Sequence, residues 1–392
     1  MDIVSVNTAL ISNQIDSSWM SYGDLYVIIP MGQRNLLSFD IVSKCAGVFE
    51  FDDEGALFNI VEGLGLSSPI IFSVTEDYLV SCAKMRHKFS VSGMSVLLAN
   101  RFRNKVIMKE VLSKEGVRVP IFNSVDARTK FSDIVNYIGL PFVMKPIDAF
   151  GSTDVEIIYN EEQYDNFLLN IEGSNFYYEY EEFIDGTLYH ADYFLHDNKV
   201  LFSSVCEYSY PNIYFKKGFP CLSLPLALGS ELRKDIEVFA LDAILRLGLK
   251  SGPAHVEVFR KENGECIFLE AGARIPGALI TNLYKDMYGF DFINSSLSLE
   301  AKRTISFVQG ENNGVVITGI YPKLKGTVKE LNNPDFTDDC IVDHLVEVGD
   351  LLQEPVNLRD VAVKIKARFI DYPEAVAAFD KLKTFSPITV EN

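Results

Sequence analysis

The sequence lacks the features of a membrane, secreted or nucleic-acid-binding protein. No apolar run approaches the roughly 18 to 20 residues of a membrane span, and no basic segment followed by an apolar one opens the chain as in a secretory signal. Six scattered cysteines without C-x-x-C spacing predict reduced thiols. A net charge of −18 disfavours nucleic acid as a partner. We therefore expect a cytoplasmic protein with neither a membrane nor a nucleic-acid partner.

Length and composition instead indicate a multidomain globular protein. With 392 residues, of which 48% are apolar and 23% charged, the chain can form two or three domains with buried cores. The first hundred or so residues alternate short apolar segments with segments of helical spacing. Strands are expected at 3–6, 25–29, 47–51 and 69–72, and helices at 55–64 and 77–88. This alternation predicts parallel strands joined by crossover helices.

The stretch with most chemical information reads as two strands joined by a tight turn. Alternating segments at 254–260 and 265–270 flank Asn263-Gly264, a dipeptide that favours a two-residue type I′ turn because both residues must take φ > 0. That turn predicts a hairpin whose register places Glu257 directly opposite Glu270 on one face of the sheet.

Two carboxylates placed in this way repel each other, so a cation is expected between Glu257 and Glu270. A divalent cation held by two carboxylates and completed by substrate phosphates is a usual form of Mg²⁺ site. His255 lies two residues before Glu257 on the same face, and Arg274 follows Glu270 by four residues. In the alternative interpretation, both glutamates point to solvent and pair with lysines.

Two lysines are candidates for binding an anion. Asn104 is expected to cap a helix whose first turn holds Lys105, where a cation is unfavourable to the helix dipole unless an anionic ligand compensates. Lys145 is expected to end a buried strand, before a loop of small residues that includes Gly151 and Ser152 and can fold its N–H groups over a phosphate. A solvated lysine and a simple turn are the alternatives. The helix is expected to pack its apolar positions 106, 107, 111 and 112 inward.

An aromatic segment at 175–193 contains the run Glu181-Glu182-Phe183-Ile184 before a turn at 185–186. A strand, a linker and a second strand arranged in this order can offer backbone N–H and C=O groups to the edge of an adenine. A simple hairpin is the alternative interpretation of this segment.

In order and spacing, these motifs resemble the ATP-grasp superfamily over nearly the whole chain. They are Lys105, Lys145, the run 181–184, and Glu257 with the pattern E-x-x-x-R-x-x-G at Glu270, Arg274 and Gly277. The resemblance implies an α/β ATP-grasp fold: an N-terminal parallel α/β domain followed by two α+β lobes that clasp ATP between them. The implied boundaries are 1–103 for the N-terminal domain, 104–186 for the small lobe, and 187–392 for the large C-terminal lobe with the metal site.

Within the superfamily, the chain looks most like the carboxylate-amine ligases that include bacterial L-amino-acid ligases. Such an enzyme uses ATP and Mg²⁺ to phosphorylate a carboxylate, and an amine then attacks the acyl phosphate to give an amide, ADP and phosphate. The resemblance implies ATP and two Mg²⁺ ions, for which Mn²⁺ can substitute. It also implies a carboxylate and an amine as small-molecule substrates, one of them an amino acid, and a homodimer.

The resemblance also implies residue roles. The residues implied to bind ATP are Lys105, Lys145 and Ser152 at the phosphates, and Glu181, Glu182, Phe183 and Ile184 at the adenosine. Leu188 stands where the family often has a ribose-binding glutamate, so either His190 or Asp192 takes that task or no residue does. Glu257 and Glu270 are implied to hold Mg²⁺. Arg274 is implied to steady the transferring phosphoryl group or the acyl-phosphate oxyanion, with the Gly277 N–H beside it. Independently of the resemblance, His255 is a candidate for positioning substrate or assisting removal of the amine proton, and a structural histidine held by hydrogen bonds is the alternative.

Three alternatives remain open at the level of sequence. An enzyme of this type can pass its acyl group to a thiol, for example on a carrier protein, or use bicarbonate or phosphate as acceptor. A nucleotide-binding protein without catalysis is the third. The charged residues at the motif positions favour the ligase, because a protein that only binds nucleotide has no need to keep all of them.

Overall fold

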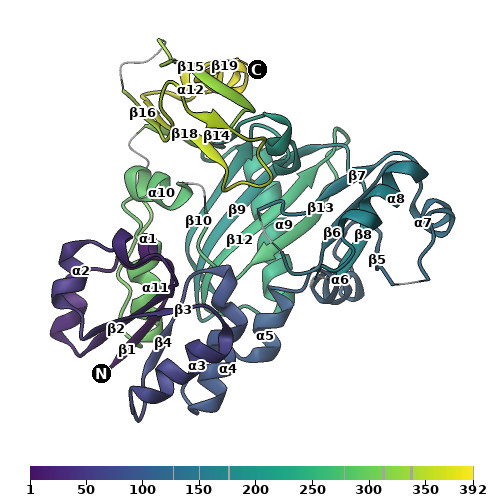
Figure 1. The fold of residues 1–392 in the computed structure, drawn as a ribbon. Helices are drawn as coiled ribbons and strands as arrows, with labels where there is room; N and C mark the ends of the chain where they lie inside the picture. The colour runs from purple at the N-terminus through teal and green to yellow at the C-terminus, as the bar shows by residue number, and fades with distance from the viewer. Residues whose placement is uncertain are drawn as a thin grey trace.

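The computed structural model describes residues 1–126, 128–149, 151–174, 177–277, 279–310, 314–335 and 339–391. Four sheets organise these residues: a parallel N-terminal sheet, a small antiparallel sheet, a large antiparallel sheet and a short C-terminal sheet (Figure 1). None of the described helices combines the length and the apolar character that crossing a bilayer requires.

The N-terminal domain is the parallel α/β unit that the alternating pattern predicts. Its sheet has the order β3-β2-β1-β4, and all three strand pairs are parallel. The strands are β1 (Ile3–Val6), β2 (Leu25–Pro30), β3 (Gly47–Phe51) and β4 (Ile70–Phe72), and the helices are α1 (Ala9–Ser12), α2 (Phe39–Lys44), α3 (Glu54–Gly63) and α4 (Leu79–Lys88). Each expected strand and helix of this domain is therefore confirmed within two residues at either end.

The small lobe lies on the right in Figure 1 and builds a sheet of order β5-β8-β6-β7. Its strands are β5 (Phe122–Ser124), β6 (Phe142–Pro146), β7 (Glu156–Ile158) and β8 (Tyr178–Glu182). Helices α7 (Phe131–Ile138) and α8 (Glu161–Asn170) pack on this sheet, and α5 (Val96–Arg101) and α6 (Lys105–Lys114) connect it to the N-terminal domain. Residues 175 and 176, at the start of the expected aromatic segment, lie outside the described residues.

Helix α6 begins as predicted but buries a different face. The Asn104 side chain accepts hydrogen bonds from the backbone N–H groups of residues 106 and 107, and Gly116 follows the helix with φ +81°. The expectation that Ile107 packs inward is wrong, because this side chain is 37% exposed. Instead, two lysines, Lys105 and Lys109, lie on the buried side of the helix.

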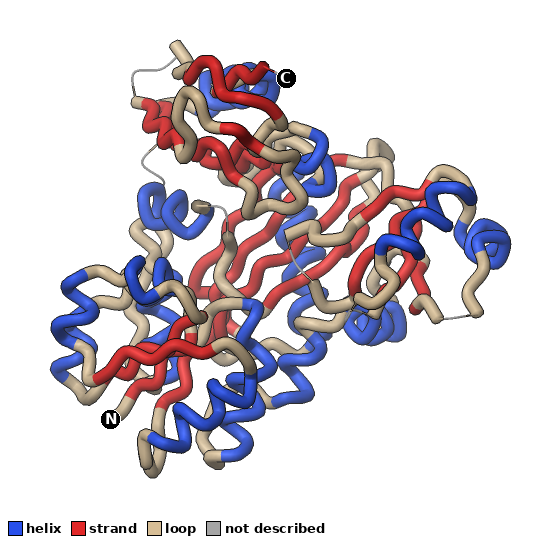
Figure 2. Tube along the Cα trace, in the orientation of Figure 1, coloured by secondary structure: helices blue, strands red, loops and turns tan. Residues whose placement is uncertain are grey.

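The large lobe is an antiparallel sheet with the order β13-β12-β9-β10-β11-β14-β18-β16. Its strands run side by side through the centre of the molecule in Figure 2. They are β9 (Thr187–His196), β10 (Lys199–Tyr208), β11 (Cys221–Pro225), β12 (Gly252–Arg260), β13 (Cys266–Gly272), β14 (Val315–Pro322), β16 (Cys340–His344) and β18 (Val361–Phe369). Alternate residues of β9 enter different cores: Tyr193 packs with α9 (Glu231–Leu247), and Phe194 packs with α10 (Ile280–Tyr288) and α11 (Phe292–Glu300).

A short C-terminal sheet completes the chain. It has the order β17-β15-β19, formed by β15 (Gly326–Leu331), β17 (Leu351–Leu352) and β19 (Ile388–Glu391). Helix α12 (Tyr372–Thr384) buries Ala375, Phe379 and Leu382 against residues of β14 and β18. The C-terminal sheet is thereby anchored to the outer strands of the large sheet.

The hairpin of β12 and β13 confirms the predicted carboxylate pair but not the predicted turn. Lys261 N–H donates to the Glu265 carbonyl (3.0 Å), so the loop has three residues and ends at Gly264 with φ +86°. Pairing from Arg260 to Val258 is therefore shifted by one residue from the predicted register. A β-bulge at Leu269 restores it, and Glu257 pairs with Glu270 as expected.

Candidate active site

A cavity of about 740 Å³ lies where the N-terminal domain, the small lobe and the large sheet meet. Its walls come from the loops that follow the parallel strands β1 and β4, from β6 and the loop after it, from the 181–186 linker, and from β12 and β13. Ligands of parallel α/β sheets commonly bind beyond the carboxyl ends of the strands. The cavity brings together residues from distant parts of the chain and from three of the four sheets.

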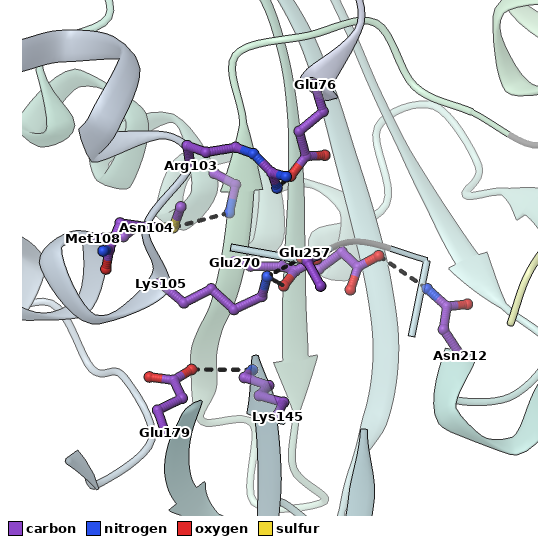
Figure 3. A network of polar contacts seen from close by, with 12 residues as sticks. Glu76, Arg103, Asn104, Lys105, Met108, Lys145, Glu179, Asn212, Glu257 and Glu270 are labelled. Atoms are coloured by element: carbon purple, nitrogen blue, oxygen red, sulfur yellow. Dashed lines mark hydrogen bonds and ion pairs between the residues drawn. The ribbon is translucent and has the colours of Figure 1, made fainter. Parts of the chain in front are cut away.

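Glu257 and Glu270 lie in one wall of this cavity, on neighbouring strands (Figure 3). Asn212 Nδ2 donates to Glu257 Oε1 (3.0 Å), and Lys105 Nζ lies 3.4 Å from Glu270 Oε2. Glu257 is 8% exposed and the Glu270 side chain 28% exposed. The alternative in which both carboxylates point to solvent is therefore wrong.

The electrostatic environment keeps Glu270 ionised. Burial on its own would raise the pKa of this carboxyl group. The cations Lys105, Lys145 and Arg274 outweigh burial and lower the pKa of Glu270 to about 2. The wall therefore presents a carboxylate at any physiological pH, which is the state that a metal ligand requires.

The two predicted phosphate-binding lysines reach the same cavity from different elements. Lys105 opens α6, and its Nζ also donates to the Ala149 carbonyl at the start of the small-residue loop. Lys145 lies in β6, where its Nζ is 2.6 Å from Glu181 Oε1. Burial would lower the pKa of Lys145, but Glu181 and other nearby glutamates raise it, so this side chain stays cationic. Ser152, in the loop between β6 and β7, lines the same cavity.

Arg274 is held over the end of β13 by a residue that the sequence did not indicate. Its Nε donates to Glu76 Oε2 (2.6 Å), and the other oxygen of Glu76 accepts from Arg103 (3.1 Å). A Cβ on Gly272 would lie 2.9 Å from Arg274 Cγ, so a glycine at 272 is needed for this side chain to fold back along the strand. Glu76 lies 198 residues before Arg274, and no local pattern connects the two. Gly277, three residues further on, also lines the cavity.

The end of β8 and the linker after it line the cavity, but two glutamate side chains of this segment already have partners. Glu182 receives two hydrogen bonds from Arg118 Nη2, both 2.9 Å long, and Glu181 contacts buried lysines. Phe183 and Ile184 also line the cavity. A nucleotide at this linker would therefore meet backbone groups and apolar side chains rather than the Glu181 and Glu182 carboxylates.

Beside the cavity lies a second group of charges, Lys109, Glu179 and Glu181, which we call the buried cluster. Of these three residues, Glu181 also lines the cavity. Lys109 Nζ lies 2.7 Å from Glu179 Oε1 and 2.5 Å from Glu181 Oε2, and its side chain is 0% exposed. Burial raises the pKa of Glu179, whereas the two lysines that contact Glu181 outweigh burial and lower its pKa. A signal for this cluster was present in the sequence, because Lys105 and Lys109 are spaced to share one helix face.

The two predicted histidines are buried in a different arrangement from the one expected. His190 is fully buried, does not line the cavity, and contacts Asp192 (2.7 Å) and Ser223 (3.1 Å). Asp192 also bonds to His255 Nδ1 (2.7 Å) and accepts from Tyr284 OH (2.5 Å). The predicted ribose contact of His190 or Asp192 is therefore contradicted by their position.

His190, Asp192 and His255 also lie close enough together to suggest a metal site. Each histidine lies with a ring nitrogen 2.7 Å from an Asp192 oxygen, which is a hydrogen-bond length, and the Tyr284 hydroxyl donates to the same carboxylate. The three side chains therefore form a hydrogen-bonded network. His255 alone of the two histidines lines the cavity, with Nε2 3.4 Å from Tyr208 OH and 3.7 Å from Glu257 Oε1.

Comparison with known proteins agrees with this geometry. Residues 138–282 match the family model described as an ATP-grasp domain. The chain is 24% identical over 296 residues to an L-arginine-specific L-amino acid ligase of Bacillus subtilis. The aligned residues make up 72% of this chain and 71% of that protein. It is 23% identical over 208 residues to a D-alanine–D-alanine ligase A of Salmonella typhimurium, covering 50% of this chain and 56% of that protein.

Solved structures share the fold over the full length. The crystal structure of an L-amino acid ligase from Bacillus licheniformis superposes with a TM-score of 0.78 at 18% identity, covering 100% of this chain and 99% of that chain. A phosphoribosylglycinamide synthetase from Anaerococcus prevotii gives a TM-score of 0.65 at 18% identity, with 100% of both chains covered.

Proposed function

Because residues 138–282 form an ATP-grasp domain, we propose that this chain is an ATP-dependent carboxylate-amine ligase. It would join a small carboxylic acid to an amine, one of them an amino acid, and release ADP and phosphate. The observation that carries the proposal is the meeting of two paired carboxylates, two lysines and one arginine in a single cavity between the lobes. The similarity to proteins named as L-amino acid and D-alanine ligases supports the same reaction class.

Glu257 and Glu270 are the residues that would hold Mg²⁺. Their oxygens are hard ligands, they face each other across the hairpin, and Lys105 is the cation nearest to Glu270 among the described ion pairs. Bound Mg²⁺ would neutralise charge on the ATP phosphates. Asn212 would keep the Glu257 carboxylate in position by its hydrogen bond to Oε1.

Lys105 and Lys145 would bind the ATP phosphates, with Ser152 in the loop that covers them. Lys145 lines the cavity and contacts Glu181 at 2.6 Å, so it would share its charge between Glu181 and a phosphate. The backbone of 181–184 would contact the adenine edge. Phe183 and Ile184 would cover apolar surface of the adenosine.

Arg274 would act on the phosphoryl group as it passes from ATP to the substrate carboxylate. This transfer needs positioning and charge neutralisation rather than a covalent nucleophile on the protein. Glu76 holds the guanidinium by a 2.6 Å hydrogen bond, so Arg274 would be oriented before substrate binds. The Gly277 N–H would lie beside the transferred group. The amine would then attack the acyl carbonyl carbon, and phosphate would leave with the C–O bond electrons as an amide forms.

His255 would position the substrate rather than bind the nucleotide. Its Nδ1 is occupied by Asp192, which leaves Nε2 directed toward Glu257 and the cavity. A ring fixed in this way can hold a substrate or water beside the metal-binding carboxylate.

The test measures ADP and phosphate release from Mg-ATP with amino acids and small acids, singly and in pairs, with mass spectrometry of the products. We expect one class of pairs to give ADP and a product equal in mass to both substrates less water. Glu262→Gln, on the exposed tip of the same hairpin, is the matched control for Glu270→Gln. ADP release without an amide would indicate a thiol or another acceptor, and ATP binding without any ADP release would contradict the ligase.

A further inference from the structure

A second pocket lies where helix α11 packs against the N-terminal domain, which are green and purple in Figure 1. Its volume is about 550 Å³, and none of its lining residues belongs to the wall of the cavity described above. One side is formed by the 3₁₀ helix η1 (Ser17–Ser21) with its neighbours, and the other by α11 with the turn that follows it. We call it the α11 pocket, and the proposed ligase reaction does not use it.

The two sides of the α11 pocket are held together by Asn294 of α11. Its side-chain oxygen accepts a hydrogen bond from the backbone N–H of Asp16 (2.9 Å), and its side-chain nitrogen donates to the carbonyl of Gln14 (3.0 Å). Asp16 in turn caps η1 by accepting from the backbone N–H of Ser18 (2.8 Å). The fold itself therefore holds the walls of this pocket together, and a ligand is not needed to assemble them.

The turn that ends α11 presents two neighbouring cations, Lys302 and Arg303, to the pocket. The backbone N–H of Lys302 donates to the Leu299 carbonyl (3.0 Å) and that of Arg303 to the Ser298 carbonyl (2.8 Å), which is the pattern of a Schellman motif. Lys302 has φ +53°, in the left-handed region where this motif usually has glycine. Glycine would fit this position with less strain, so the backbone alone does not account for a lysine here.

The guanidinium of Arg303 has no hydrogen bond or ion pair to any residue that the structure describes. Its Cζ lies 3.4 Å from the centre of the Tyr22 ring and 5.3 Å from that of Trp19. Every other arginine of the chain has at least one hydrogen bond or ion pair with a described residue. Although the chain has a net charge of −18, no described carboxylate thus approaches Arg303 within ion-pair distance.

The position of Arg303 at the end of a helix explains its charge but not its free donors. A cation is favourable near the C-terminus of α11 because of the helix dipole. The same benefit would remain if the side chain were solvated or paired with an acidic residue. Stacking on Tyr22 instead covers one face of the guanidinium and fixes its plane, while its N–H groups at the edge stay available.

We propose that the α11 pocket binds the anionic group of a small molecule, a carboxylate or a phosphate, through Arg303 and Lys302. A guanidinium of fixed orientation can donate two parallel hydrogen bonds to a pair of anionic oxygens, and the lysine adds a second positive charge. Asp16 is the acidic residue among those that line the pocket. The anionic group therefore binds on the α11 side, and an uncharged or cationic part of the ligand extends toward Asp16.

Trp19 makes this proposal directly measurable, because it is the single tryptophan of the chain and lines the α11 pocket. The test titrates the full chain, without ATP or magnesium, with sodium phosphate and separately with sodium acetate, while sodium chloride keeps the ionic strength constant. We expect a saturable change of Trp19 fluorescence. Saturation by phosphate alone would identify a phosphate ligand, saturation by acetate alone a carboxylate ligand, and saturation by both a site that accepts either group.

Variants assign the fluorescence change to the pocket. Arg303→Gln should weaken binding of the saturating anion about 10- to 100-fold, the range of one charge-assisted hydrogen bond. Lys302→Glu, at an exposed position, should weaken it about 10-fold because repulsion replaces attraction. Arg128→Gln, whose side chain is 92% exposed on the small lobe, is the matched control and should bind as wild type. Lys105→Met, which changes the proposed ATP site, should keep the fluorescence change.

Three results would overturn the proposal. The first is a fluorescence change that does not saturate with either anion, or that sodium chloride alone reproduces. The second is equal binding by wild type and a folded Arg303→Gln, with circular dichroism as the measure of folding. If Arg303→Gln does not fold, unchanged binding by Lys302→Glu is the deciding result. The third is loss of the change in Lys105→Met, because the anion would then act from the ATP site.

Discussion

Two groups of lysine and glutamate each take a lysine from α6, one helical turn apart, yet they have different surroundings. The buried cluster joins Lys109 of α6 to the two glutamates of β8, with side chains 0 to 4% exposed. What we call the cavity cluster consists of Lys105, Glu257, Glu270 and Arg274, and it lines the 740 Å³ cavity. Lys145 contacts Glu181 of the buried cluster and also lines the cavity.

The difference lies in how each carboxylate is neutralised. In the buried cluster, Lys109 meets a carboxylate on either side within hydrogen-bond distance. In the cavity cluster, Glu257 meets an amide at 3.0 Å and His255 at 3.7 Å, so its charge is only weakly compensated by those neighbours. Carboxylates that are fully buried and bonded to a lysine support the fold, whereas two carboxylates that face a cavity from neighbouring strands can hold a cation between them. Residue types alone do not separate these two roles.

The largest effect is expected for Glu270→Gln, which removes one carboxylate of the proposed metal pair. An amide cannot neutralise Mg²⁺ as a carboxylate does, so turnover should fall to the background rate of ATP hydrolysis. ADP release under saturating substrates measures it, with Glu262→Gln as the control that keeps full activity. Near-normal turnover in Glu270→Gln would show that the cavity cluster does not hold the catalytic cation.

Arg274→Ala should have the next largest effect. The guanidinium faces developing charge, so its loss should lower kcat by about 1,000-fold while ATP affinity changes far less. Glu76→Gln tests whether the orientation of Arg274 matters, because this variant keeps Arg274 but weakens the 2.6 Å hydrogen bond from its Nε to residue 76. A smaller loss of kcat in Glu76→Gln than in Arg274→Ala is expected, and equal kcat in wild type and Arg274→Ala would remove this residue from the mechanism.

The buried cluster should respond in stability rather than in chemistry. Lys109→Met keeps the volume of the side chain but leaves Glu179 and Glu181 with Lys145 as their remaining nearby lysine, at 3.8 Å and 2.6 Å. The loss of the buried partner should cost about 3 kcal/mol in the free energy of unfolding. Lys105→Met, one helical turn earlier on the same face, is the matched comparison and should impair ATP binding with a smaller loss of stability. Urea unfolding monitored by circular dichroism measures both variants. Equal stability losses would show that the two clusters do not differ in the way described.

The sequence predicted the features that depend on residues close together in the chain. The Asn104 cap, the parallel N-terminal sheet and the pairing of Glu257 with Glu270 all follow from short patterns, although the pairing was reached through the wrong turn: the longer loop and the bulge at Leu269 compensate each other. A register argument of this kind can therefore succeed while a step within it fails.

Longer-range features could not be predicted. The bond from Glu76 to Arg274 joins residues 198 positions apart, and only the folded chain brings them together. His190 was expected at the ribose because it stands near the family position. It pairs with Glu257 across the sheet, but Tyr208 covers its ring, with the ring centroids 4.5 Å apart, and buries it. Whether a polar side chain faces a cavity or a core depends on which neighbours cover that face, and the sequence of one strand does not contain this information.

The smallest expected effect is on the pH dependence of stability, and here Glu270 and Glu179 should differ in sign. The pKa of Glu270 is lowered to about 2 from its ordinary value of 4.5, so this group contributes stability above pH 4.5 that is lost as the pH falls toward 2. The pKa of Glu179 is raised, because burial outweighs its lysine partners, so this group contributes stability below its ordinary pKa that is lost as the pH rises. In magnesium-free buffer, the free energy of unfolding should therefore fall less between about pH 6 and about pH 3 in Glu270→Gln than in wild type, and more in Glu179→Gln. If both variants changed the pH dependence of the unfolding free energy in the same direction, Glu270 and Glu179 would have pKa values shifted in the same direction. The proposed difference between the cavity cluster and the buried cluster would then be wrong.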